Sequence, residues 1–142
     1  MKKFLSISIM LFVICFVGTV NNAHAVGFVD LFPVNSPIST TPQYSFDQGE
    51  TPYLYMNLSI PDGAIAATIS GWNDPDGLGY FSDVEISADT QRWASLSDWN
   101  SVEKTGPWTI HANYFDFFGN NSVASTDFHV VPEPATMSLL LL

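Results

Sequence analysis

The chain has 142 residues, with 4 Lys+Arg against 14 Asp+Glu, a formal net charge of −10 and 46% hydrophobic residues. This length predicts one domain rather than two, and the acidic balance excludes binding to nucleic acid phosphates and anionic lipid headgroups. The single cysteine, Cys15, lies in the N-terminal apolar run, so disulfides, thiolate metal ligands and a Cys nucleophile are excluded from the rest of the chain.

Residues 1–25 have the pattern of a secretory signal peptide. Lys2 and Lys3 form a positive start, an apolar run follows, and Ala23 and Ala25 complete an A-x-A cleavage site. The alternative is an uncleaved membrane anchor, but the run is near the lower limit for spanning and contains polar residues. Cleavage after Ala25 would leave two basic residues against the 14 acidic ones, a formal net charge of about −12.

Residues 26–131 are expected to form one all-β domain, because their apolar residues alternate with a period of two. The alternation covers residues 53–60, 80–87, 108–115 and 125–130. Turn-forming residues stand between these stretches, at Pro61–Gly63, Asp74–Gly77, Thr105–Pro107 and Phe118–Asn121. Only 89–101 is irregular enough for a short helix or loop. The pattern predicts an antiparallel β-sandwich of about seven or eight strands, with a small barrel or jelly roll as the alternative.

The stretch Gly106–Val130 sharpens the sandwich prediction. It contains Gly-x-Trp, an alternating strand, Asp-x-x-Gly-Asn and finally Phe-x-Val. This order resembles the last hairpin of bacterial immunoglobulin-like or fibronectin-type repeats, which implies that Trp108 enters the core and that Asp116–Asn120 form the turn. Pro107 predicts that the strand begins at or after Trp108, because proline has no N–H for the ladder.

Residues 132–142 form a tail unlike the domain before them. Pro132, Glu133 and Pro134 follow Val131, and the last four residues are leucines. With the signal peptide, this ending resembles the PEP-CTERM sorting signal of exported Gram-negative proteins. The resemblance implies processing by an exosortase, a membrane-embedded Cys protease/transpeptidase, in species that make exopolysaccharide and biofilm. The tail is truncated relative to that family, because a membrane span needs about 20 residues and the family's arginine cluster is absent.

Two carboxylates, Asp74 and Asp76, lie in the short turn 73–77. Oxygen-rich loops of this kind suit calcium, which takes roughly six to eight oxygen ligands. The spacing does not match the twelve-residue EF-hand loop, and a plain turn rich in Asp, Pro and Gly explains the residues equally. The sequence favours the plain turn, keeps calcium as the alternative, and predicts no other cofactor.

Aromatic residues supply the candidate binding surfaces. Trp72, Trp93 and Trp99 are the candidate carbohydrate contacts, and the last two lie in the least regular segment among polar residues. Exposed indoles there would stack on sugar rings, whereas the alternative is a loop that tucks them against the sandwich edge. A second aromatic group lies near the hairpin tip, either exposed for a partner or packed on neighbouring loops: Phe115, Phe117 and Phe118.

No pattern indicates catalysis, because Gly-x-Ser-x-Gly and His-Glu-x-x-His are both absent. His111 and His129 alternate outward on two strands expected to be neighbours, where solvated histidines are common. The sequence therefore predicts an exported, non-enzymatic, exopolysaccharide- or biofilm-associated protein of the cell surface, outer envelope or extracellular matrix. Its expected partner is the exosortase, and it meets the membrane only through its signal peptide and tail. The alternative is a carbohydrate-binding module for exopolysaccharide.

Overall fold

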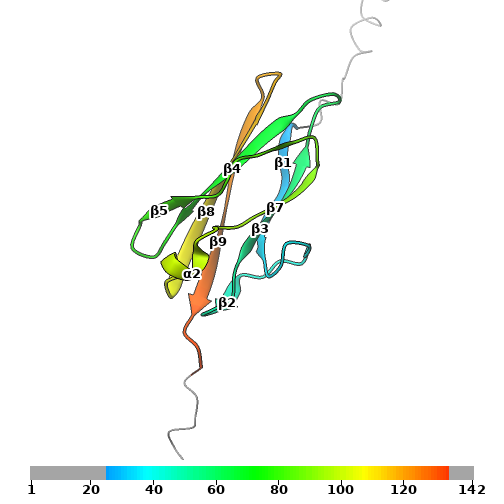
Figure 1. Ribbon diagram of the computed structural model, residues 1–142. Helices are drawn as coiled ribbons and strands as arrows, with labels where there is room; N and C mark the ends of the chain where they lie inside the picture. Colours follow the sequence, from blue (N-terminus) through cyan, green and yellow to red (C-terminus); the bar gives the residue numbers. More distant parts are fainter. Residues whose placement is uncertain (1–24, 135–142) are drawn as a thin grey trace, which may run out of the picture.

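A computed structural model describes residues 25–134, which form two packed β-sheets (Figure 1). Residue Ala23 with the rest of segment 1–24, and the tail 135–142, lie outside the described residues, so the predicted signal peptide and most of the tail stay predictions. Within 25–134, no helix has the length and apolar character needed to cross a membrane.

The smaller sheet has three antiparallel strands in the order β1-β3-β7. The larger sheet has the order β2-β9-β8-β4-β5, with β6 also paired to β4, and only its β2–β9 pair is parallel among the described strands. The bounds are β1 (Gly27–Val34), β2 (Ser45–Asp47), β3 (Tyr53–Ser59), β4 (Ala66–Asn73), β5 (Gly79–Phe81), β6 (Glu85–Ser87), β7 (Gln91–Ala94), α2 (Trp99–Val102), β8 (Gly106–Asp116) and β9 (Asn121–Val131).

This architecture confirms the predicted all-β sandwich of the immunoglobulin-like class, with nine strands in the described residues. The extra strands are short. The stretch 80–87, expected to be one strand, is divided into β5 and β6, which pair with opposite ends of β4. Ser82 lies between them and turns inward, where its Oγ accepts a hydrogen bond of 3.0 Å from the Ser70 N–H. The alternation ends at the break between β5 and β6, so Val84 and Ile86, which would share the buried face of Ser82 in one continuous strand, are exposed.

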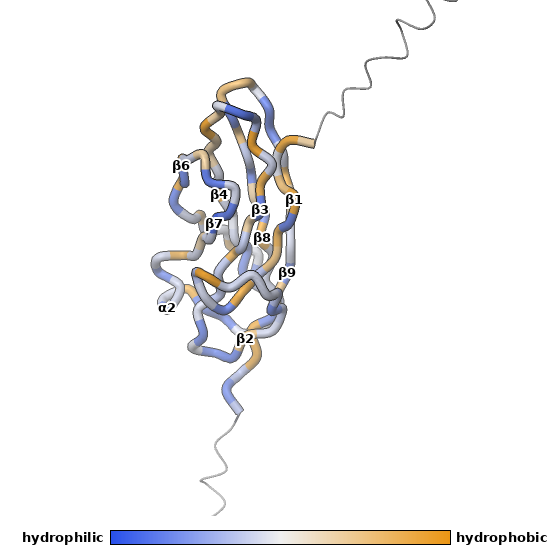
Figure 2. The backbone as a smooth tube through the Cα atoms, turned by 90° about the vertical axis from the view of Figure 1, so that its right-hand side faces the viewer, coloured by the Kyte–Doolittle hydropathy of each residue, from blue (hydrophilic) through white to orange (hydrophobic). Residues whose placement is uncertain are grey.

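The core lies between the sheets and is rich in aromatic residues. Along β8, Trp108, Ile110, Ala112 and Tyr114 are all fully buried, which confirms the predicted alternation. Figure 2 shows that hydrophobic and hydrophilic residues are interspersed along the chain of the sandwich. Buried rings remove large apolar areas from water, on the order of 150–250 Å² each, and so stabilise a domain that has no cysteine after residue 25.

Strand β8 begins at Gly106, which corrects the expectation that it starts at or after Trp108. Pro107 pairs with His129 of β9. On the other side of β8, the ladder to β4 extends only to Thr109. Pro107 therefore lies beyond the end of β4 and has a strand neighbour on one side only, a position that tolerates proline.

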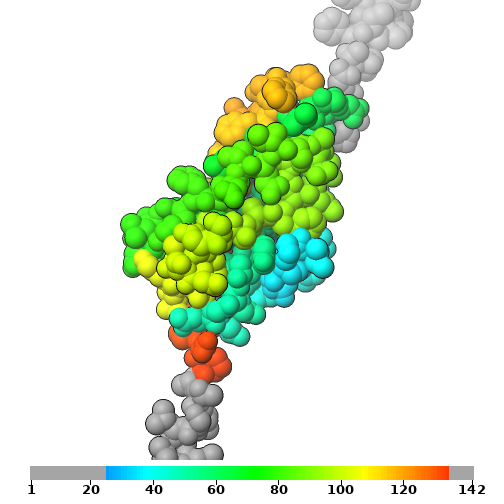
Figure 3. Space-filling model, in the orientation of Figure 1, coloured from blue at the N-terminus to red at the C-terminus, as the bar shows by residue number. Residues whose placement is uncertain are grey.

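The turn between β8 and β9 is the predicted Asp-x-x-Gly-Asn turn. The Asp116 Oδ1 accepts hydrogen bonds from the N–H groups of Phe118 (2.9 Å) and Asn120 (3.0 Å). Gly119 has φ +83°, a value that favours glycine. This hairpin tip lies at one end of the molecule, and the chain leaves the sandwich at the opposite end, at Val131–Pro134 (Figure 3).

Candidate functional site

Two of the three candidate carbohydrate contacts are wrong, because Trp72 and Trp99 lie in the core with 0% and 2% exposure. The single turn of α2 directs Trp99 between Trp72 and Trp108, with ring centroids 6.5 and 4.8 Å away. The Trp99 indole N–H donates to the Glu50 carbonyl oxygen at 2.8 Å. Neither ring presents a face to solvent, so neither can stack on a sugar.

Trp93 is the candidate that remains at the surface, because it is half-buried. Its indole N–H donates to the Ser39 carbonyl oxygen at 2.7 Å. Its ring packs on Tyr55, with centroids 5.3 Å apart. These two contacts fix the orientation of the ring without covering it completely, and Trp93 lines a hollow of about 180 Å³.

This hollow, called here the polar hollow, lies between β7 of the smaller sheet and the β5–β6 connection of the larger sheet. Within residues 25–134, the side chains of Asp83, Glu85, Ser95 and Ser97 form no hydrogen bond or ion pair. Those groups are available to a ligand, and Trp93 lines the same hollow. The lining residues are Ser82, Asp83, Glu85, Trp93, Ala94, Ser95 and Ser97.

Arg92 lies behind the polar hollow and is 3% exposed. Burial lowers the pKa of Arg92 below its ordinary value, and the charges of Glu85 and Asp89 oppose that shift. Its guanidinium donates five hydrogen bonds of 2.6–3.2 Å, which tie β7 to β4 and β6. The acceptors are the Thr68 hydroxyl and the carbonyl oxygens of Ala66, Glu85, Ser87 and Asp89.

The sequence analysis did not predict the structural role of Arg92. A signal was present, because Arg92 shares the alternation of Ala94 and Leu96, both buried. An arginine at an inward-facing strand position is expected to connect neighbouring strands through hydrogen bonds, provided that buried acceptors surround its guanidinium. Those acceptors come from β4 and β6.

The predicted calcium residues, Asp74 and Asp76, are brought together, but around the Lys104 ammonium. Lys104 Nζ lies 2.5 Å from an Asp74 oxygen and 2.9 Å from an Asp76 oxygen. Asp74 also accepts hydrogen bonds from the N–H groups of Asp76 and Leu78. This geometry fits the turn interpretation. The carboxylate oxygens that the calcium alternative requires are bound to the Lys104 ammonium instead. Within residues 25–134, no group of three or more His, Cys, Asp or Glu could hold a metal.

The charges in this cluster stabilise each other. Burial alone would raise the pKa of Asp74, but hydrogen bonds from Lys104, Leu78 and Asp76 outweigh it, so the pKa lies below its ordinary value. Hydrogen bonds to Asp74 and Asp76 raise the pKa of Lys104 against the opposing effect of burial. Both partners therefore stay ionised at neutral pH, and neither is a candidate acid or base.

The two histidines within residues 25–134, His111 and His129, point outward as expected, because both are exposed. They do not form a pair. His111 is opposite Ser125 in the β8–β9 ladder, whereas His129 is opposite Pro107. At about 3.4 Å per residue, four positions along the ladder separate them by roughly 14 Å, which is too far for a shared metal ion.

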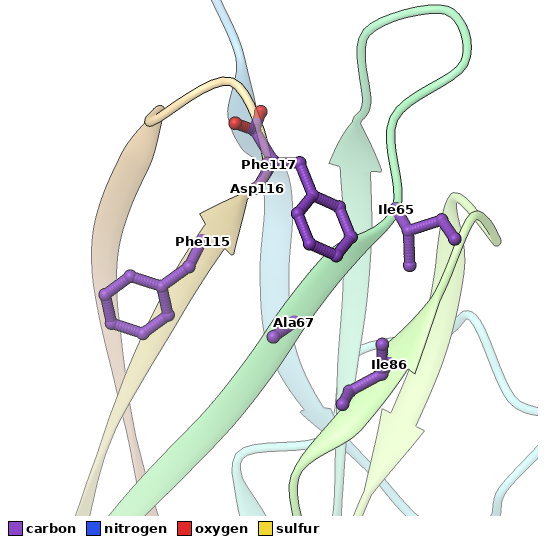
Figure 4. Close-up of a pocket in the computed structure, with 6 residues that line it drawn as sticks. All are labelled: Ile65, Ala67, Ile86, Phe115, Asp116 and Phe117. Carbon is purple, nitrogen blue, oxygen red and sulfur yellow. The ribbon is translucent and has the colours of Figure 1, made fainter.

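The hairpin tip forms a second hollow, the apolar hollow, of about 210 Å³, lined by Ile65, Ala67, Ile86, Phe115, Asp116 and Phe117. The ring of Phe117 extends over β4 toward Ile65, while the Asp116 carboxylate points away from the hollow (Figure 4). Phe115, Phe117 and Phe118 are 50%, 81% and 65% exposed. The tip phenylalanines are thus exposed rather than packed on neighbouring loops.

Comparisons with known proteins assign no family to this chain. No model of a protein family matches the chain, and no curated protein matches it. Among solved structures, the chain is similar to the crystal structure of CopC from Methylosinus trichosporium OB3b, at 15% sequence identity and a TM-score of 0.48. That likeness covers 78% of this chain and 97% of the other.

Proposed function

We propose that this chain is an exported, non-enzymatic protein of the cell surface, outer envelope or extracellular matrix that carries a PEP-CTERM sorting signal. The observation that supports it is the exit of the chain from the sandwich. Strand β9 ends at Val131, and Pro132, Glu133 and Pro134 are all exposed beyond it. Proline fixes an extended backbone and removes ladder donors, so the motif stands free for an exosortase to bind.

The position of the motif also fits a protein whose folded domain survives processing. The last paired residue of β9 is Val131, which pairs with Asp47 of β2, and its carbonyl oxygen accepts a hydrogen bond from the Gln48 N–H at 2.9 Å. Cleavage after these contacts would leave every strand and the aromatic core intact. The sandwich would then remain as a stable unit in a matrix of exopolysaccharide.

The test is the intact mass of the natural protein in each cell fraction of its host. We expect a product that lacks residues 1–25 and ends near Pro132–Pro134, found on the surface or in the matrix. A variant with Pro132→Ala and Pro134→Ala should keep its tail. The matched control changes two exposed loop prolines, Pro37→Ala and Pro42→Ala, and should be processed normally. Processing of the motif variant at the parent's rate would refute the sorting role.

The second candidate function is carbohydrate binding, now centred on Trp93 alone. The observation that favours it is the polar hollow, which is lined by Trp93 together with two serines and two acidic residues whose side chains form no hydrogen bond or ion pair within residues 25–134. Quenching of tryptophan fluorescence by the host polysaccharide would support it, and Trp93→Ala should abolish the effect. Phe117→Ala, in the apolar hollow, is the control and should bind as the parent does. Equal binding by the parent and by Trp93→Ala would exclude this site.

A further inference from the structure

The charges on the described chain restrict which glycan the polar hollow can hold. After residue 25 the sequence has only two lysine or arginine side chains, Arg92 and Lys104. Arg92 is buried and donates to five acceptors. Lys104 is held by Asp74 and Asp76. No lysine or arginine side chain in residues 25–134 is therefore left to bind a uronate, sulfate or phosphate on a glycan, and the exposed His111 and His129 are not among the residues that line the polar hollow.

The hollow itself has the opposite character. Asp83 and Glu85 both line it, and neither carboxylate is paired with a cation in the described residues. Arg92 donates to the Glu85 carbonyl oxygen at 3.2 Å and attracts the Glu85 carboxylate over a longer distance, but its guanidinium is buried and forms no ion pair with that carboxylate within residues 25–134. Two unpaired carboxylates favour a ligand that brings a positive charge and repel one that brings a negative charge.

Trp93 adds a second preference for a cation. The face of an indole attracts an ammonium group through its quadrupole, and tryptophan is the best of the aromatic side chains for this contact. The Trp93 ring is held on Tyr55 and by Ser39, so little ordering is needed on binding. The adjacent Ser95 and Ser97 hydroxyls line the same hollow and can both donate to and accept from ring hydroxyls.

The size of the hollow limits the ligand to a small unit. Its volume is about 180 Å³, below the roughly 300–1,000 Å³ typical of sites for drug-sized ligands. We propose that the polar hollow binds a single amino sugar unit of a glycan, with its free ammonium group held by Asp83 and Glu85 and its ring against Trp93. This inference rests on the second candidate function above and names its ligand class.

The experiment is calorimetric titration of the folded chain with four tetrasaccharides, in 0.15 M salt with a chelator present. The probes are β-1,4-linked tetramers of glucosamine, of N-acetylglucosamine and of glucose, and a tetramer of galacturonic acid. We expect the glucosamine tetramer to bind about tenfold tighter than the acetylated and neutral tetramers, and the galacturonic acid tetramer to show no binding. The chelator removes any calcium bridge between carboxylates.

Two double variants separate a specific site from general attraction to an acidic protein. Asp83→Asn with Glu85→Gln keeps the shape of the hollow and removes both charges, and it should weaken glucosamine tetramer binding about tenfold. Asp62→Asn with Asp127→Asn removes two exposed charges elsewhere and should leave that binding unchanged. Equal weakening by both pairs would overturn the proposal, because it would show attraction to net charge alone.

The remaining outcomes distinguish the inference from the function on which it rests. If the neutral or acetylated tetramer binds as tightly as the glucosamine tetramer, and Trp93→Phe weakens both, carbohydrate binding stands and the amino sugar assignment fails. Binding of the galacturonic acid tetramer also refutes the assignment. If no tetramer binds a chain whose thermal unfolding is normal, both fail.

Discussion

The polar hollow and the apolar hollow are held in place by different means. The polar hollow lies along residues 93–97, and this segment is fixed to the core at both ends, by Arg92 before it and by Trp99 after it. The apolar hollow depends on a hairpin tip whose turn is organised locally by Asp116. A site that must select a ligand benefits from fixed groups, so the difference favours the polar hollow as the specific site.

The largest expected effect comes from removing Trp99, which fixes one end of the polar hollow segment to the core. Trp99→Ala deletes a buried indole that packs on Trp72 and Trp108. We expect the free energy of unfolding to fall by about 4 kcal/mol, in line with other buried aromatic truncations. Urea denaturation measures it. Trp93→Ala, at the half-buried ring, is the matched control and should cost far less. Equal losses would mean that Trp99 is not a core residue.

The second anchor, Arg92, is expected to have a slightly smaller effect. Arg92→Met keeps much of the apolar stem but leaves the Thr68 hydroxyl and buried carbonyl oxygens, such as that of Ala66, without donors. We expect a loss of about 3 kcal/mol in the free energy of unfolding. Thr90→Met, an exposed change two residues earlier and just before β7, is the control. Denaturation curves that coincide for the two variants would show that the Arg92 hydrogen bonds do not stabilise the fold.

Acid should loosen the hairpin tip. Burial raises the pKa of Asp116, but hydrogen bonds from Asn120, Tyr114 and Phe118 outweigh it and leave the pKa below its ordinary value. A depressed pKa contributes stability above the unfolded value, near 3.9, and this stability is lost as the pH falls through the folded value. Asp116→Asn should therefore be less stable than the parent at pH 7, and the difference should shrink toward pH 2.

The measurement is thermal unfolding of both proteins across this pH range. Asp127→Asn, on the outer face of β9, is the control and should follow the parent at every pH. A difference between Asp116→Asn and the parent that stays constant down to pH 2 would contradict the ionised network at the turn. Such a result would mean that the ionised Asp116 carboxylate does not organise the turn beside the apolar hollow.

The fold was predictable where one face of a strand is buried along its whole length. Trp108, Ile110, Ala112 and Tyr114 follow one another at every second position because the pleat directs all four into the core. Residues 80–87 show a similar alternation, yet they form two short strands that each pair only with β4. At a sheet edge the pattern is not enforced by a core, so it misled the prediction.

The candidate site was only partly predictable, because its decisive contacts are far apart in the sequence. Trp93 and Trp99 lie in one polar segment, and local composition does not reveal which indole turns inward at a single helical turn. Arg92 is satisfied by Ala66 and Thr68, which are 26 and 24 residues away. From local sequence alone, a polar side chain is predicted to be exposed, because the distant acceptors that would bind it in the core are not known.

The smallest expected effect concerns Phe117, whose exposure of 81% means that it contributes little to folding. Phe117→Ser should change the free energy of unfolding by less than about 0.5 kcal/mol, while it should reduce binding of a hydrophobic dye because it removes the main ring over the apolar hollow. Dye fluorescence and urea denaturation test the two expectations together. A large loss of stability would show that the tip ring packs in solution. A small loss with weaker dye binding would show that this tip is an apolar surface kept without any benefit to folding, as expected of a contact surface rather than of a core.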